Sequence, residues 1–222
     1  MNTLIAILLA ATLQFTEAYK SEYQNALEFY RQHPEVKQQL IESGLTDDEA
    51  TMAMAIVAPE LAVHYVFSDW AQTKTLQLIY VKYDHSDFSI GYFQMKPSFI
   101  EYLEKRIAGD EAMKKQYGDI VIRATDFTQQ RKIRVARLTS LKWQTKYLCA
   151  FMQYAKQRKD VFKSPEERVA YWATLYNAGF DVSDQTIAKL RKIRGFPTLR
   201  RQFNYSEIAL IFYKALKEQE KK

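Results

Sequence analysis

The sequence predicts a single α+β domain that is predominantly α-helical and carries one small β-hairpin. Three observations lead to this fold class. Apolar residues recur at helical spacing over most of the chain, whereas one stretch, residues 75–83, is rich in β-branched and aromatic residues and partly alternates. The 222 residues, 47% of them hydrophobic, can fill one core, and only 6 Gly and 5 Pro exclude a collagen-like or linker-dominated chain.

The first eighteen residues differ from the rest of the chain. Residues 4–13 (LIAILLAATL) are an apolar run too short to cross a bilayer as a helix, and small residues follow at Thr16 and Ala18. We therefore expect a signal peptide over residues 1–18 and a mature domain over residues 19–222. The alternative is an apolar first helix of a cytosolic domain.

Helices are expected in the next part of the chain, over residues 21–33 and 35–43, within an N-terminal extension that covers residues 19–45. Thr46 and Glu49 have the spacing of a capping box, which predicts the start of a helix running through Met52–Val66. Pro59 lies inside it and should kink it or end one segment there.

The β-hairpin is predicted to consist of a strand over residues 75–83, a turn over residues 84–87 and a second extended segment over residues 88–95. Pro97 should then open a helix. Helical periodicity dominates the remainder. The helices expected there cover residues 98–107, 128–138, 141–159, 165–177, 184–193 and 206–217.

The composition limits the cofactors and partners. The single cysteine, Cys149, lies in an apolar stretch and should be buried, and one cysteine excludes an intrachain disulfide or a cysteine zinc cluster. No metal site and no cofactor are expected. The formal charge of +6 and a pI near 9.2 favour an anionic partner, and basic residues gather over residues 131–137 and 189–194.

Glu60 is the first candidate for chemistry. At helical spacing it neighbours Ile56, Val57 and Val63, so its carboxyl lies on an apolar stripe. Burial there should raise its pKa toward the range of a general acid. The alternative is a structural Glu at the rim of the stripe or one paired with an Arg.

Two further segments combine residue types suited to a sugar ligand. Residues 89–97 (SIGYFQMKP) contain Ser89, Gly91, which permits close approach to the backbone, and Gln94, which offers an amide. Residues 171–179 (YWATLYNAG) end in Tyr176, Asn177 and a glycine. Alone, the first also fits a β-bulge and the second an ordinary helix C-cap.

Taken in order, these segments resemble the catalytic domain of the soluble lytic transglycosylases, relatives of goose-type lysozyme. The family has a catalytic Glu on a helix, a Gly-x-x-Gln loop followed by Pro, a Tyr-Asn-Ala-Gly segment and a late Tyr. The matches here are Glu60, residues 91–94 with Pro97, residues 176–179, and Tyr205, and they span about residues 46–217. The resemblance implies a lysozyme-like fold.

The chain also departs from the family pattern. Leu61 follows the Glu where the family usually has Ser, and Lys96 stands where Met is common. The 34 residues from Glu60 to Gln94 exceed the usual gap. Ser86 and Ser89 both compete for the place of the family's substrate-binding serine. These points indicate a divergent member.

The resemblance implies cleavage of peptidoglycan between N-acetylmuramic acid and N-acetylglucosamine, with formation of a 1,6-anhydro ring. Glu60 would act first as acid and then as base, while Ser89, Gly91, Gln94, Tyr176, Asn177 and Tyr205 would bind substrate or shape the cleft. The partner would be peptidoglycan glycan strands, with peripheral contact to membrane or wall polymers, and no nucleic acid is expected. The protein would be exported to the periplasm or cell envelope.

Alternative functions remain open from the sequence. An inverting muramidase needs a second carboxylate roughly 6.5–9.5 Å from the acid, and Asp84 or Asp87 could supply it, although both residue types are also ordinary turn formers. A non-catalytic protein that binds cell wall or nucleic acid is the alternative from another class. The basic segments could neutralise phosphates or simply form solvated helix faces.

Overall fold

The computed structural model describes residues 13–64, 79–82, 87–158, 161–197 and 201–221, and these are overwhelmingly helical. Besides a short helical stretch at residues 13–18, the principal helices are α2 (Lys20–Gln32), α3 (Pro34–Glu42), α4 (Asp47–His64), α6 (Pro97–Ala108), α7 (Glu111–Tyr117), α8 (Phe127–Leu138), α9 (Leu141–Arg158), α10 (Pro165–Ala178), α11 (Asp184–Leu190) and α12 (Tyr205–Gln219).

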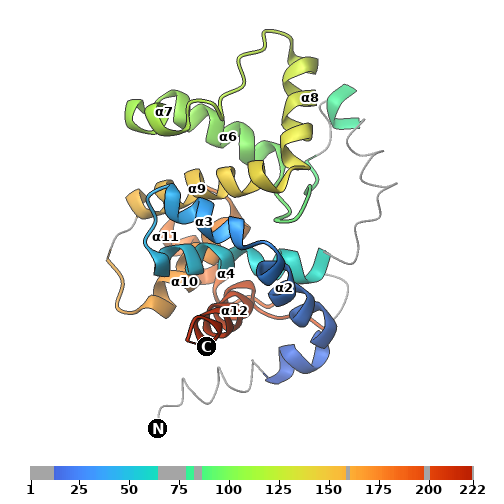
Figure 1. Ribbon diagram of the computed structural model, residues 1–222, viewed down its shortest axis with the longest axis vertical. Helices are drawn as coiled ribbons and strands as arrows, with labels where there is room; N and C mark the ends of the chain where they lie inside the picture. Colours follow the sequence, from blue (N-terminus) through green and yellow to red (C-terminus); the bar gives the residue numbers. More distant parts are fainter. Residues whose placement is uncertain (1–12, 65–78, 83–86, 159–160, 198–200, 222) are drawn as a thin grey trace.

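Helix α9 separates two groups of helices (Figure 1). Helices α6, α7 and α8 lie on one side of it, and α4, α10 and α12 lie on the other. None of the helices in the described part of the chain has the length and apolarity needed to cross a membrane.

Helix α4 is the centre of the larger group. It packs against α2, α3, α9, α10 and α12, and its residues from Ala50 to Pro59 are all buried. A helix that is apolar on every side belongs in the interior of a domain, which explains this position. The predicted capping box is confirmed, because the Thr46 backbone N–H donates to Glu49 Oε2 at 3.0 Å and the Glu49 N–H donates to Thr46 Oγ1 at 3.2 Å.

The helical predictions are confirmed, with ends that differ by a few residues. Pro59 does not end α4, which continues to His64. Helix α7 was not predicted from the sequence. Its start is fixed by the Asp110 carboxylate, which accepts the N–H groups of Ala112 and Met113. Cys149 is buried as expected.

The predicted β-hairpin is not confirmed. Residues 79–82 of the expected first strand are helical, and the rest of that strand, with the turn residues 84–86, lies outside the described residues. The expected second strand, residues 88–95, is a tight turn closed by an isolated bridge between Ile90 and Met95. The partial alternation of residues 75–83 predicted a strand, but contacts with α6 and α8 hold residues 79–82 in a helical turn.

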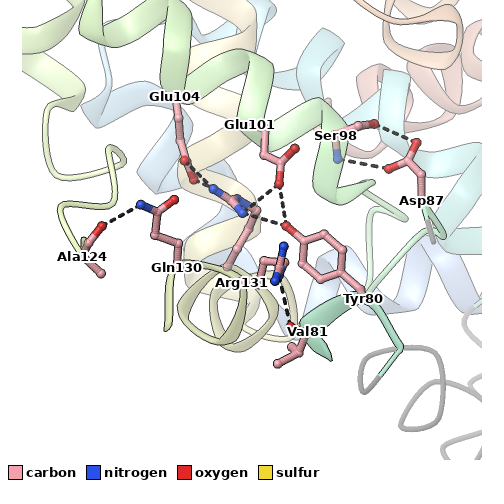
Figure 2. Close-up of polar contacts among 10 residues, drawn as sticks. Tyr80, Val81, Asp87, Ser98, Glu101, Glu104, Ala124, Gln130 and Arg131 are labelled. Atoms are coloured by element: carbon pink, nitrogen blue, oxygen red, sulfur yellow. Dashed lines mark hydrogen bonds and ion pairs between the residues drawn. The ribbon is translucent and has the colours of Figure 1, made fainter. Parts of the chain in front are cut away.

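Those contacts centre on the buried side chain of Arg134 in α8. Figure 2 labels its partners Tyr80, Glu101 and Glu104. The Arg134 guanidinium pairs with Glu104 Oε2 at 2.8 Å and Glu101 Oε1 at 2.9 Å, and donates to the Tyr80 hydroxyl at 2.6 Å. The Tyr80 hydroxyl in turn donates to Glu101 at 2.6 Å. Residues 79–82 are therefore attached to α6 and α8 through one charged cluster.

The first described residues take part in the core. Phe15 is 0% exposed, and its ring contacts Tyr19 and also Phe203 and Phe212 from the other end of the chain, at centroid distances of 5.3, 5.4 and 6.2 Å. Cleavage after Ala18, as the expected signal peptide requires, would remove this ring from the core. Cleavage of a signal peptide over residues 1–18 stays a prediction.

Candidate active site

Glu60 lies in the last third of α4, between buried neighbours Pro59 and Leu61. Glu60 as a whole residue is partly exposed, whereas its carboxyl group is almost entirely buried. Burial raises the pKa of Glu60 to about 8, and the positive charge of Lys96 acts against this shift. At neutral pH the carboxyl is therefore mostly protonated, as a general acid requires.

Three tyrosines surround this part of α4, and their hydroxyls all donate to backbone carbonyls. Tyr30 of α2 bonds to Met54 at 2.7 Å, Tyr205 of α12 bonds to Ile56 at 3.0 Å, and Tyr176 of α10 bonds to Phe93 at 2.6 Å. We call Tyr30, Tyr176 and Tyr205 the tyrosine cluster.

Two members of the tyrosine cluster, Tyr176 and Tyr205, lie within electrostatic range of the acid. The pKa values of Tyr176 and Tyr205 are raised first by burial and then by the charge of Glu60. Both rings are almost fully buried, with 7% and 5% of their surface exposed. They therefore position α4 and the turn after residue 90, and offer a ligand little surface of their own.

The Gly91–Gln94 turn is built as a compact loop. Gly91 has φ +76° and Gln94 has φ +50°, which is the left-handed region. For a residue other than glycine this conformation is uncommon and is often held at functional sites. The Gln94 amide Nε2 donates to the Gly91 carbonyl at 2.8 Å, which closes the loop.

The Gln144 side chain of α9 forms hydrogen bonds with the backbone of this turn. It is fully buried, accepts the Phe93 N–H at 2.6 Å, donates to the Ile90 carbonyl at 3.0 Å and also bonds to the Leu138 carbonyl. This combination satisfies both ends of the amide and orders the backbone on either side of Gly91.

The reason for glycine at position 91 differs from the expectation. From the sequence, Gly91 was expected to let a ligand approach the backbone closely. In the structure a Cβ at Gly91 would overlap the Gln144 amide and the Leu138 carbonyl. The chain's own α9 therefore occupies the space beside Gly91, and the residue is needed for packing.

Lys96 and Asp87 flank the start of α6. Lys96 Nζ lies 3.8 Å from Asp87 Oδ2, and both side chains are about half exposed. Asp87 also accepts the Ser98 N–H at 3.0 Å and the Ser98 hydroxyl at 2.7 Å, as Figure 2 shows. Asp87 thus stabilises the helix start through both carboxylate oxygens.

The other residues expected at the site are less tightly placed. Ser89 is partly exposed just before the turn, and Asn177 is exposed at the end of α10. Asp84 and Ser86 lie outside the described residues. The structure thus brings together Glu60, Tyr176 and Tyr205, and ties Gly91 and Gln94 to Tyr176 through Phe93.

Sequence reasoning missed Tyr30 and Gln144. Gln144 could have been noticed as a polar residue in register with Leu148 and Phe151 on the buried face of α9. Tyr30 carried no such signal, because a tyrosine on an amphipathic helix is ordinary.

No protein-family model, curated protein or solved structure matches this chain. The resemblance to lytic transglycosylases therefore rests on the ordered segments of this sequence and on the site that they form.

Proposed function

We propose that the protein is a peptidoglycan lytic transglycosylase that cleaves the β-1,4 bond between N-acetylmuramic acid and N-acetylglucosamine. The observation that carries the proposal is the Glu60 carboxyl, which is buried on a partly exposed residue and has its pKa raised to about 8. A carboxyl that stays protonated at neutral pH can donate to a glycosidic oxygen.

The proposed reaction uses this carboxyl twice. Glu60 donates its proton to the glycosidic oxygen as the bond to the muramic acid C1 breaks and an oxocarbenium-like centre develops. The resulting carboxylate then accepts the proton of the muramic acid 6-hydroxyl as that oxygen bonds to C1. This closes the 1,6-anhydro ring, restores the protonated acid and consumes no water. Proximity favours the internal hydroxyl strongly.

The surrounding residues support this chemistry by position. Tyr30 and Tyr205 hold the α4 backbone just before Glu60, and Tyr176 holds the turn that carries Gln94. The Gln94 amide oxygen remains as an acceptor for a substrate acetamido N–H, since its nitrogen closes the turn. Ser89 and Asn177 would contact the glycan from the exposed rim.

An inverting hydrolase is supported less well. Such an enzyme needs a second carboxylate free to activate water. Asp87, one of the two candidates, uses both of its oxygens to hold Ser98. The structure thus gives Asp87 a helix-capping role.

The proposed substrate requires export to the cell envelope. The apolar residues 4–13 would direct the chain there. Because Phe15 packs in the core, we propose that residues 13–18 stay attached to the domain after export.

The decisive experiment is digestion of purified peptidoglycan, with mass spectrometry of the products. We expect products that carry anhydro ends and weigh one water less than hydrolysis products. Glu60→Gln should lower cleavage by at least about 100-fold, the usual contribution of a general acid, without lowering the thermal transition. Glu111→Gln, at a side chain that is 88% exposed, is the matched control and should keep full activity.

Three results would contradict the proposal. Products with reducing ends would establish a hydrolase. Unchanged cleavage by Glu60→Gln would remove the acid from the mechanism. Loss of folding in the same variant would make Glu60 structural.

A further inference from the structure

The end of α11 and the segment that joins it to α12 are strongly basic. Between Gln185 and Gln202 the sequence has six Lys or Arg residues and no Asp or Glu. Five of these cations belong to the described residues, and all five are exposed. They are Lys189, Arg191, Lys192, Arg194 and Arg201, which we call the basic loop.

The cations of the basic loop are available to a partner. Within the described part of the chain, none of them forms an ion pair, and Arg201 instead lies over the Phe203 ring at 5.6 Å. Elsewhere exposed cations pair with neighbouring carboxylates, as Arg31 does with Glu28 and Lys114 with Glu111. Unpaired charge of one sign over a short segment favours an anionic partner.

An apolar side chain lies among these charges. Ile193 is 56% exposed, and it sits between Lys192 and Arg194. Its backbone is fixed, because the Ile193 carbonyl accepts the Asn204 side-chain amide at 2.8 Å. The exposed isoleucine is therefore held in place at the surface.

The basic loop is also joined to the start of the described chain. Gly195 and Phe196 bond to Phe203, whose ring contacts Phe15, and the Tyr19 hydroxyl donates to the Arg201 carbonyl at 2.9 Å. Leu13, in the helical stretch at residues 13–18, is 55% exposed. An exposed apolar residue that ends the run at residues 4–13 is thus attached to the same region as the cations.

We propose that the basic loop docks the protein on an anionic phospholipid bilayer, with Ile193 entering the interface between headgroups. Cations near an anionic surface and apolar side chains that leave water are the two contributions to peripheral membrane binding. A nucleic acid or an anionic wall polymer would be bound mainly through the cations, whereas a bilayer interface also buries an apolar side chain such as Ile193. This interaction is independent of the proposed cleavage reaction.

The test is sedimentation of the full chain with vesicles of phosphatidylcholine, with and without phosphatidylglycerol. We expect binding only to the anionic vesicles, with an affinity that falls as salt is added. The triple variant Arg191→Gln, Lys192→Gln, Arg194→Gln should bind at least tenfold more weakly. Ile193→Ser should bind several-fold more weakly at the same net charge.

A matched triple variant controls for net charge. Lys105→Gln, Lys115→Gln and Lys132→Gln remove three exposed cations from α6, α7 and α8 and should leave most of the binding intact. Circular dichroism confirms that each variant folds. Equal losses in the two triple variants would overturn the proposal.

Two further outcomes would also overturn it. If Ile193→Ser binds vesicles normally, the apolar part of the interface is absent. If the chain binds duplex DNA as tightly as the anionic vesicles and Ile193→Ser changes neither, the loop is a general polyanion site. Glu60→Gln should bind vesicles like the wild type, which separates this result from failure of the proposed enzyme activity.

Discussion

Glu60 experiences two opposing effects on its pKa at the edge of α4. Burial raises the pKa, and the positive charge of Lys96 lowers it, with burial the larger effect. The sequence predicted the first effect, because a carboxyl on an apolar helical stripe is costly to ionise. It could not predict the second, because Lys96 is 36 positions away and reaches the acid only through the fold.

The Lys96 charge should set the alkaline limit of activity. Lys96→Met removes the cation that favours the ionised form, so the pKa of Glu60 should rise further and the alkaline limb of kcat/KM should move to higher pH. Lys105→Met, at another exposed lysine of α6, should leave the profile unchanged. A pH–rate profile measures both, and a shift to lower pH in Lys96→Met would contradict the electrostatic account.

Stability should also depend on the protonation of Glu60. Its folded pKa of about 8 lies above the unfolded value of about 4.3, so between these values the folded state holds the extra proton. The free energy of unfolding should therefore fall as pH rises through this window, by at most about 1.4 kcal/mol per unit. Glu60→Gln has no titrating carboxyl at this position, so its free energy of unfolding should not show this fall. Denaturant unfolding should show its advantage over wild type growing from pH 5 to pH 8, and a constant difference would contradict the raised pKa.

Two glycines with left-handed backbone allow the packing at Gly91 to be tested. Gly91 has φ +76° and would place a Cβ into Gln144 and Leu138, whereas Gly179 has φ +95° and open space around it. Gly91→Ala should therefore cost about 1–3 kcal/mol more than Gly179→Ala, which carries only the backbone strain. Chemical denaturation measures the difference, and equal costs would rule out the overlap.

Most elements followed from the sequence because their signals are local. Capping residues, prolines at helix starts and apolar spacing placed the helices that were expected, and Thr46 and Glu49 form the bonds that their spacing implies. The helix at residues 79–82 was misread as strand because its conformation is coupled to Arg134, which is 54 positions away from Tyr80. Tertiary contacts overrode β-propensity there.

The attachment of residues 79–82 should be separable from the stability of the whole. Arg134→Met leaves Glu104 buried without its partner and should cost about 3–5 kcal/mol, whereas Tyr80→Phe loses only hydrogen bonds and should cost about 1–2 kcal/mol. Hydrogen exchange should show faster exchange of residues 79–82 in Tyr80→Phe, with α9 unchanged. Equally fast exchange in α9 would mean that the segment does not open by itself.

At the scale of the whole molecule, aromatic packing brings the two ends of the chain together. Phe15 and Tyr19 meet Phe203, and Phe15 also meets Phe212 of α12. The signal peptide over residues 1–18 stays a prediction, because an apolar run near an N-terminus looks alike whether it is cleaved or packed. The contacts of Phe15 with Phe203 and Phe212, nearly 200 positions away, could not be predicted from the sequence.

The contribution of the helical stretch at residues 13–18 to stability can be measured in the full chain. Phe15→Ala should lower the free energy of unfolding by about 3–5 kcal/mol, the usual cost of emptying a buried phenylalanine site. Leu13→Ala, at a side chain that is 55% exposed, should change it by less than about 0.5 kcal/mol. Equal effects would show that the helix is not part of the core.

The three phenol-to-carbonyl bonds join parts of the chain that are distant in sequence. Through Tyr30, helix α2 bonds to α4 at Met54, and through Tyr205, helix α12 bonds to α4 at Ile56, two residues nearer the acid. Through Tyr176, α10 bonds to the turn at Phe93. Because α2 and α12 both bond to the backbone of α4, a displacement of either helix would be transmitted to the part of α4 that carries Glu60.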